Sequence, residues 1–161
     1  MTLEPLINAP LPVQVHVAAA LVAAALGPVA LWRRRRDGWH RMTGYAWVLS
    51  MAVAAGSTLL IASPFAVLGP FGPIHALSVA VFWSLAAGLR HARAGRHGAH
   101  AAEFRGLYRN ALGIAALFTL LPGRRINLAL FGDRPEWGLW VIAAVGTLWL
   151  LRAGLPRRRR A

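Results

Sequence analysis

Histidine is the residue type in this chain that is best suited to chemistry. Six histidines occur among 161 residues, whereas there is no cysteine and there are only five acidic residues. The missing cysteines exclude disulfides, thiolate-bound zinc, iron–sulfur clusters and thiol nucleophiles. An imidazole can ligate a metal or a haem iron, and it can transfer protons near neutral pH. The six positions are His16, His40, His75, His91, His97 and His100.

The elements that would position these histidines are five apolar blocks. Hydrophobic residues make up 57% of the chain and charged residues 14%. A helix that crosses a bilayer needs roughly 20 mostly apolar residues, and the blocks lie at about 13–32, 43–67, 73–89, 98–121 and 137–151. Short links make consecutive helices antiparallel neighbours. We therefore predict an all-α fold, a single integral membrane domain over residues 1–161. Four antiparallel transmembrane helices would form its core, and a fifth transmembrane helix would pack beside them.

The fourth block is the least apolar of the five. Its first half carries Glu103, Arg105, Arg109 and Asn110, so these side chains must reach the membrane interface or face other helices. Glu103 follows His100 by three residues on a helix. It is therefore a candidate either to orient that imidazole or to pair with a loop arginine.

The placement of the arginines predicts the orientation. All 18 basic residues are arginine, and the net charge is +13. Three arginines, Arg124, Arg125 and Arg134, flank one face of the predicted bundle. The other fifteen flank the opposite face, namely Arg33 to Arg36, Arg41, Arg90, Arg93, Arg96, Arg105, Arg109, Arg152 and Arg157 to Arg160. Because arginines accumulate in cytoplasmic loops, we predict a membrane protein with its N-terminus outside and its C-terminus in the cytoplasm.

Two further expectations follow from the charges. The first block is preceded by Glu4 and followed by four arginines, which is typical of a retained helix and not of a cleaved signal peptide. Since the arginines lie at membrane flanks, nucleic acid is not an expected partner.

Four of the histidines fall into two layers of the predicted bundle. His16 and His75 lie in the first turns of the first and third helices, near the outer surface. His40 and His100 lie at the starts of the second and fourth helices, near the inner surface. Alternate helices of an up-down bundle are diagonal, so each pair would face across the core. Two facing imidazoles supply both axial ligands of a b-type haem. The layers therefore favour two haem b groups, with the haem iron bound by each pair, and an electron path across the bilayer.

Other residues bear on haem binding. Arg109 near the inner pair and Arg124 near the outer pair are candidates to hold haem propionates by charge-assisted hydrogen bonds. Binding of anionic lipid headgroups is the alternative for Arg109. Small residues on the His16 face would leave room for a flat ring, although such residues commonly serve close helix packing. His91 and His97 are expected to be solvated loop residues.

Two other functions remain open. The chain could be a non-enzymatic membrane protein, such as a transporter subunit or an assembly or interaction factor, with interfacial or proton-responsive histidines. The histidines could also bind a divalent cation directly, but two imidazoles without a carboxylate are too few for a tight zinc site. No nucleotide-binding loop and no hydrolase motif is present, so the sequence assigns no enzymatic activity. The expected partners are the lipid bilayer and, for an electron carrier, a membrane redox partner or quinone. The sequence gives no oligomeric state.

Four segments carry a resemblance to a known family. They are His16–Ala20 leading to Gly27-Pro28, Asp37–Gly44 with Trp47 and Met51, Gly72–Ser78, and His100–Tyr108 followed by Phe118–Arg124. Together they resemble a bacterial family of small predicted multi-pass membrane proteins, a domain of unknown function, over about residues 13–127. The resemblance implies a multi-pass membrane protein with no established activity. It singles out the four layered histidines, and it departs from the family at Phe104, where a methionine is usual.

The histidine layout is also similar to that of transmembrane di-haem b-type cytochromes of the ascorbate-reducible type. Those proteins pair ligands across alternate helices of a four-helix core. This similarity concerns the arrangement alone, so what it implies about haem is an analogy at the level of the site.

Overall fold

The computed structural model describes residues 3–33, 35–63 and 67–154. Arg34 and Arg157–Arg160, counted above on the inner face, and Pro64, near the expected end of the second helix, lie outside the described residues. The described chain is helical apart from turns and one isolated bridge, which confirms the predicted all-α class. It divides into two compact units, Ala9–Ile114 and Met1–Asn8 with Ala115–Ala161.

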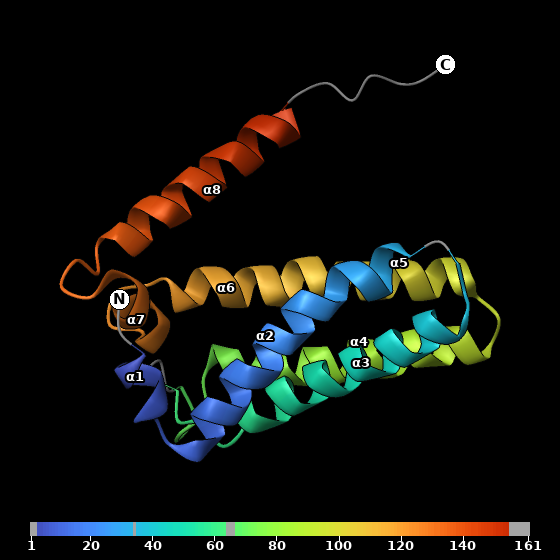
Figure 1. The fold of residues 1–161 in the computed structure, drawn as a ribbon, viewed down its shortest axis with the longest axis horizontal. Helices are drawn as coiled ribbons and strands as arrows, with labels where there is room; N and C mark the ends of the chain where they lie inside the picture. The colour runs from blue at the N-terminus through green and yellow to red at the C-terminus, as the bar shows by residue number, and fades with distance from the viewer. Residues whose placement is uncertain (1–2, 34, 64–66, 155–161) are drawn as a thin grey trace. The chain divides into compact units, whose positions relative to one another are not determined.

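The larger unit is a four-helix bundle. Its helices are α2 (Leu11–Trp32), α3 (Gly38–Thr58), α4 (Pro73–Arg93) and α5 (His97–Leu107), and the π-helical turn η1 (Tyr108–Leu112) leads from α5 into α6 (Gly113–Thr119). α2 packs on α3, α3 on α4 and α4 on α5, while α5 and η1 close the ring against α2 (Figure 1). The helix pairs α2/α4 and α3/α5 are therefore diagonal, in the order that the sequence predicts.

Two helices have boundaries that differ clearly from the prediction. The second helix, expected at about 43–67, occupies Gly38–Thr58. Asp37 starts it, because its carboxylate accepts a hydrogen bond from the backbone N–H of His40 at 3.0 Å, as an N-cap does. The third helix, expected to end at 89, continues through Arg93. Both expected boundaries followed the apolar runs, whereas polar residues form the helix ends.

Aromatic rings fill the centre of the bundle. Trp47 is fully buried and packs against Phe104 with ring centroids 5.2 Å apart. Tyr108 lies against Gly27 of α2, and its hydroxyl donates to an α2 carbonyl at 3.0 Å. The small residue at Gly27 therefore serves close packing of a neighbouring aromatic side chain and leaves no open space for a flat ring.

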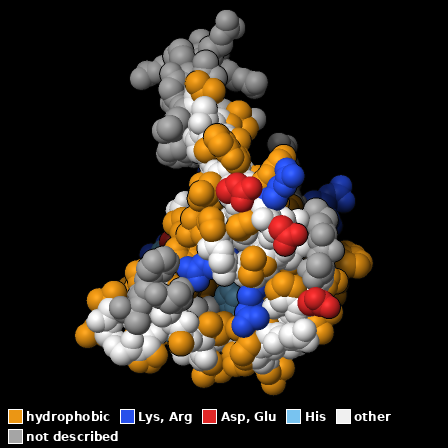
Figure 2. Space-filling model, turned by 90° about the vertical axis from the view of Figure 1, so that its left-hand side faces the viewer, with side chains coloured by type: hydrophobic (Ala, Val, Ile, Leu, Met, Phe, Trp, Pro, Cys, Tyr) orange, Lys and Arg blue, Asp and Glu red, His pale blue; other side chains and the backbone are white. Residues whose placement is uncertain are grey.

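Two helices of the described chain, α2 and α4, are long and apolar enough to cross a membrane. α8 (Trp137–Gly154) contains a shorter apolar stretch. A bundle of four transmembrane helices with a fifth beside it is therefore not confirmed. Large apolar side chains are nevertheless exposed on these three helices, among them Leu21 (62%), Trp83 (70%) and Trp140 (72%). Hydrophobic atoms also cover much of the face shown in Figure 2, as contact with lipid requires.

The smaller unit is organised around Asn127. This side chain is fully buried on α7 (Arg125–Phe131), and its amide donates to the carbonyls of Leu120 at 2.6 Å and Pro135 at 2.9 Å. Arg125 donates to the carbonyl of Pro5 in α1 (Glu4–Ile7) at 2.9 Å. Asn127 thus joins the turn after α6 to the loop before α8.

Candidate functional site

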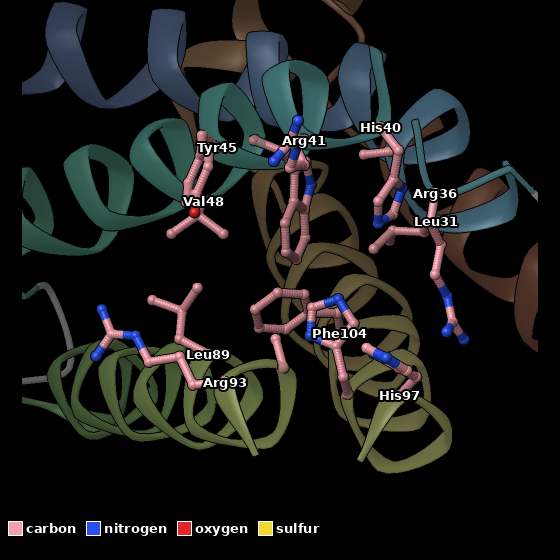
Figure 3. A pocket seen from close by; sticks show the side chains of 15 residues that line it. Leu31, Arg36, His40, Arg41, Tyr45, Val48, Leu89, Arg93, His97 and Phe104 are labelled. Carbon is pink, nitrogen blue, oxygen red and sulfur yellow. The ribbon is translucent and has the colours of Figure 1, made fainter. Parts of the chain in front are cut away.

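The arginine-rich end of the bundle contains a cavity of about 350 Å³. All four helices α2 to α5 contribute to it (Figure 3), and the buried side chains of Trp47 and Phe104 are part of its lining. Its polar lining consists mainly of three histidines and three arginines, His40, His97, His100, Arg36, Arg41 and Arg93. The volume falls in the range of about 300–1,000 Å³ that is usual for small-molecule pockets. We refer to it as the inner cavity.

His100 has a defined tautomer. Its Nδ1 lies 2.9 Å from the carbonyl oxygen of Gly88 on α4. A carbonyl only accepts hydrogen bonds, so Nδ1 donates and Nε2 of the neutral ring keeps its lone pair. Hydrogen bonds of this kind orient metal-ligating imidazoles in proteins. The ring also packs edge-on against Phe104, with centroids 4.7 Å apart, so it is fixed at the cavity wall.

His40 reaches the same cavity from the diagonal helix. The Asp37 cap begins α3 and so puts His40 in its first turn, and Figure 3 shows the ring directed toward the cavity. Nδ1 of His40 is buried and has no hydrogen-bond partner among the described residues. Leaving a buried polar atom unpaired costs about 1–3 kcal/mol. At this cavity, then, the ring of His40 has a buried nitrogen whose hydrogen bond the described chain does not supply.

The arginines that line the inner cavity do not include Arg109, which the sequence predicts to hold a haem propionate there. Arg36, Arg41 and Arg93 line it. Arg109 lies on η1, is absent from the lining, and donates from Nε to the carbonyl of Arg105 at 3.3 Å. Nine residues separate it from His100, which corresponds to about 13 Å along a helix. These three arginines could have been predicted from the sequence, because they lie close to His40 and His97 along the chain.

The outer histidines are held by the polar groups of the bundle. Nδ1 of His16 lies 2.8 Å from the carbonyl oxygen of Ala54 and 2.9 Å from the hydroxyl of Thr58, both on α3. His75 is buried, and its Nδ1 accepts a hydrogen bond from the backbone N–H of Gly72 at 3.1 Å. The neutral His75 ring therefore carries its proton on Nε2, where an iron ligand needs a lone pair. Neither histidine lines the inner cavity.

Arg124 belongs to the smaller unit. Its guanidinium lies 4.4 Å from the centroid of the Phe118 ring, in a cation–π contact. Burial lowers the pKa of Arg124, yet arginine stays protonated in proteins. The binding of a haem propionate by Arg124 stays a prediction.

A second cavity, of about 540 Å³, lies between α4 and the α5–η1 segment. We call it the groove. His91 and Glu103 are among its lining residues. His91 was expected in a loop, but α4 extends through Arg93 and carries it on the last turn. Glu103 forms no salt bridge with an arginine in the described part of the chain, and it is Gly88, not Glu103, that orients His100.

The described residues contain no side-chain cluster that supports direct metal binding. Among the described residues, no group of three or more histidine, cysteine, aspartate or glutamate side chains is placed to hold a metal ion. A bis-histidine haem site needs only two such side chains from the protein.

Comparison with known proteins identifies the family. A family model described as "Predicted membrane protein (DUF2306)" matches residues 13–152. The chain belongs to this family. The DUF2306 match extends beyond the segments that carry the resemblance and takes in most of α8. As a DUF2306 protein, the chain is expected to lie in a lipid bilayer. No curated protein and no solved structure matches it, so the similarity to di-haem cytochromes is not shown.

Proposed function

We propose that this protein binds a b-type haem between His40 and His100 and carries electrons within the bacterial inner membrane. The main support is that these histidines lie on diagonal helices and line one cavity together with three arginines. The hydrogen bond to Gly88 leaves Nε2 of His100 available, and Nδ1 of His40 has no partner in the described chain. Two neutral imidazoles are the axial ligands that such a haem takes.

The remaining cavity residues suit the rest of the haem. Ala30, Val48 and Leu89 offer apolar contact to the macrocycle. Arg36, Arg41 and Arg93 would hold its propionates by charge-assisted hydrogen bonds, in place of Arg109. When bound, the haem supplies reversible one-electron chemistry, while the chain orients the ligand rings and limits the access of water.

A second haem at His16 and His75 completes the two-haem version of the proposal. It requires His75 to give up the hydrogen bond from Gly72 so that Nε2 can bind iron. The inner pair needs no comparable rearrangement at His100. We therefore expect the inner pair to bind haem more tightly than the outer pair.

The proposal includes a transmembrane orientation. The strong excess of arginine at one end supports a cytoplasmic location for the inner cavity and an outside N-terminus. The four bundle helices and α8 would span the bilayer. Electrons would then enter or leave this haem near the cytoplasmic surface.

A non-enzymatic role, as a transporter subunit or an assembly factor, is the second candidate. His75 favours it, because its Nδ1 accepts a hydrogen bond from the backbone at the start of α4 and its Nε2 therefore carries the proton. Histidines used in this way stabilise helix contacts and need no cofactor.

Single histidine variants test the ligand assignment. Protein expressed with haem supplied and purified in detergent is expected to show a low-spin Soret band. His40→Ala and His100→Ala should each abolish that band, because each removes one axial ligand. His97→Ala is the matched control at the same cavity and should retain it. A band that survives both His40→Ala and His100→Ala would overturn the assignment.

A further inference from the structure

The groove between α4 and α5 has the shape of an amphiphile site. Small residues of both helices, Ala80, Ala99, Ala102 and Gly106, line it and leave space that larger side chains would fill. Toward one end it is lined by Leu77, Val81 and Ile114 with Asn110 among them, and toward the other by Ser84, Glu103 and His91. The polar end lies at the arginine-rich end of the bundle, since α4 finishes there.

The two polar residues lie at different heights in the bundle, less than two helical turns apart. The hydrogen bond between His100 and Gly88 fixes the antiparallel register of α4 and α5. His91 lies three residues past Gly88 toward the end of α4, and Glu103 lies three residues past His100 in the opposite direction, so they are separated by about 9 Å along the axis. A ring with a donor at each of two opposite positions can bridge this separation, whereas a single donor cannot.

Both side chains have unused hydrogen-bonding capacity. Nδ1 of His91 is buried and has no partner among the described residues. Glu103 is half-buried, and the salt bridge found in the described chain joins Arg33 to Asp37 and leaves Glu103 out. A carboxylate only accepts hydrogen bonds, and a neutral imidazole has one accepting nitrogen. The polar end is therefore suited to a ligand with two hydrogen-bond donors.

We propose that the groove binds a lipid-soluble hydroquinone. Its two ring hydroxyls would donate to the Glu103 carboxylate and to an imidazole nitrogen of His91, and its apolar tail would lie along Leu77, Val81 and Ile114. A phospholipid fits the polar end less well, because its phosphate would meet the negative charge of Glu103.

The groove and the inner cavity lie on two sides of the same helix. On α5, His100 and Phe104 line the inner cavity, whereas Glu103 and Leu107 line the groove. The two sites are thus separated by one helix, whose diameter is about 10 Å. A bound hydroquinone would donate electrons to the haem, one at a time, and would release its two ring protons as it becomes the quinone. This role rests on the proposed function, whereas the binding of the hydroquinone does not.

Photoaffinity labelling of protein prepared without haem tests the binding directly. A photoreactive azido-quinone, reduced to its hydroquinone, should label peptides of α4 and α5 from the groove, and an excess of unlabelled hydroquinone should suppress the labelling. Glu103→Ala and His91→Ala should each weaken binding about tenfold, the effect of losing one hydrogen bond in a partly buried site. Glu136→Ala, an exposed acidic residue of the smaller unit, is the matched control and should bind as the wild type does.

Two results would overturn the inference: labelling that is unchanged in Glu103→Ala and His91→Ala, or equal competition by an anionic phospholipid. The outcome is separable from the haem proposal. Hydroquinone labelling that persists in His40→Ala, which is expected to lose haem, would uphold the groove by itself.

Discussion

At the residue scale, hydrogen bonding distinguishes four histidines that the sequence treats alike. The ring of His100 donates to Gly88, whereas that of His75 accepts from Gly72. His16 resembles His100, since its Nδ1 lies beside the carbonyl oxygen of Ala54 on α3, whereas Nδ1 of His40 has no partner in the described chain. Helical spacing predicts the two layers, but it does not predict tautomers. Those depend on contacts such as His16 to Ala54, 38 residues apart.

Gly88 offers a test of packing at the inner cavity. A Cβ added there would overlap the ring of Phe104, and overpacking of this kind usually costs about 1–3 kcal/mol. Gly88→Ala should therefore lower the thermal unfolding midpoint in detergent, followed by circular dichroism. Gly44→Ala is the matched control, because a Cβ at Gly44 meets nothing within 4 Å. Equal midpoints for Gly88→Ala and the wild type would contradict the packing at this position.

At the element scale, polar residues and not apolar runs set the ends of the helices. The apolar pattern locates the helices of the bundle and their order. It misplaces the second helix by several residues, because Asp37 begins that helix before its apolar run. It also leaves His91 in a loop, although α4 continues past it. Both of the proposed binding sites depend on these polar helix ends, and so the apolar pattern alone could not outline them.

Asp37 gives the α3 start a predictable pH dependence. Hydrogen bonds from Arg33, and next from the backbone N–H of His40, hold the pKa of Asp37 well below its usual range. Its stabilising effect is therefore present above the unfolded-state pKa of about 3.9 and is lost as the pH falls through the lower pKa of the folded state. Asp37→Ala should unfold at a lower temperature than the wild type at pH 7, with the difference shrinking as the pH falls below 4.

Asp37→Asn separates the cap from the charge. Asparagine retains a cap acceptor but not the ion pair with Arg33, so its loss of stability should be smaller than that of Asp37→Ala. A pH-independent difference between Asp37→Ala and the wild type would contradict the linkage.

At the scale of the whole molecule, composition predicts the class, and the four resembling segments predict the family. The long apolar blocks predict an all-helical membrane protein, and the DUF2306 match supports that class. The division into two units at Ile114 and Ala115 has no marker in the sequence, because it falls within a continuous apolar run. The groove was not predictable either, since it arises from small residues of two helices that meet only in the fold.

The orientation can be tested with single cysteines, because the chain has none of its own. Leu68 in the α3–α4 loop and Arg96 in the α4–α5 loop are both exposed. In spheroplasts, Leu68→Cys should react with a membrane-impermeant maleimide, whereas Arg96→Cys should react only after lysis. The reverse pattern would contradict the orientation with an outside N-terminus.

The central claim is that the inner cavity holds a haem, and a difference spectrum tests it most directly. The protein would be expressed with haem supplied, purified in detergent, and recorded as dithionite-reduced minus oxidised. We predict sharp α and Soret bands of a low-spin b-type haem. A flat spectrum from protein that is folded by circular dichroism would contradict the account.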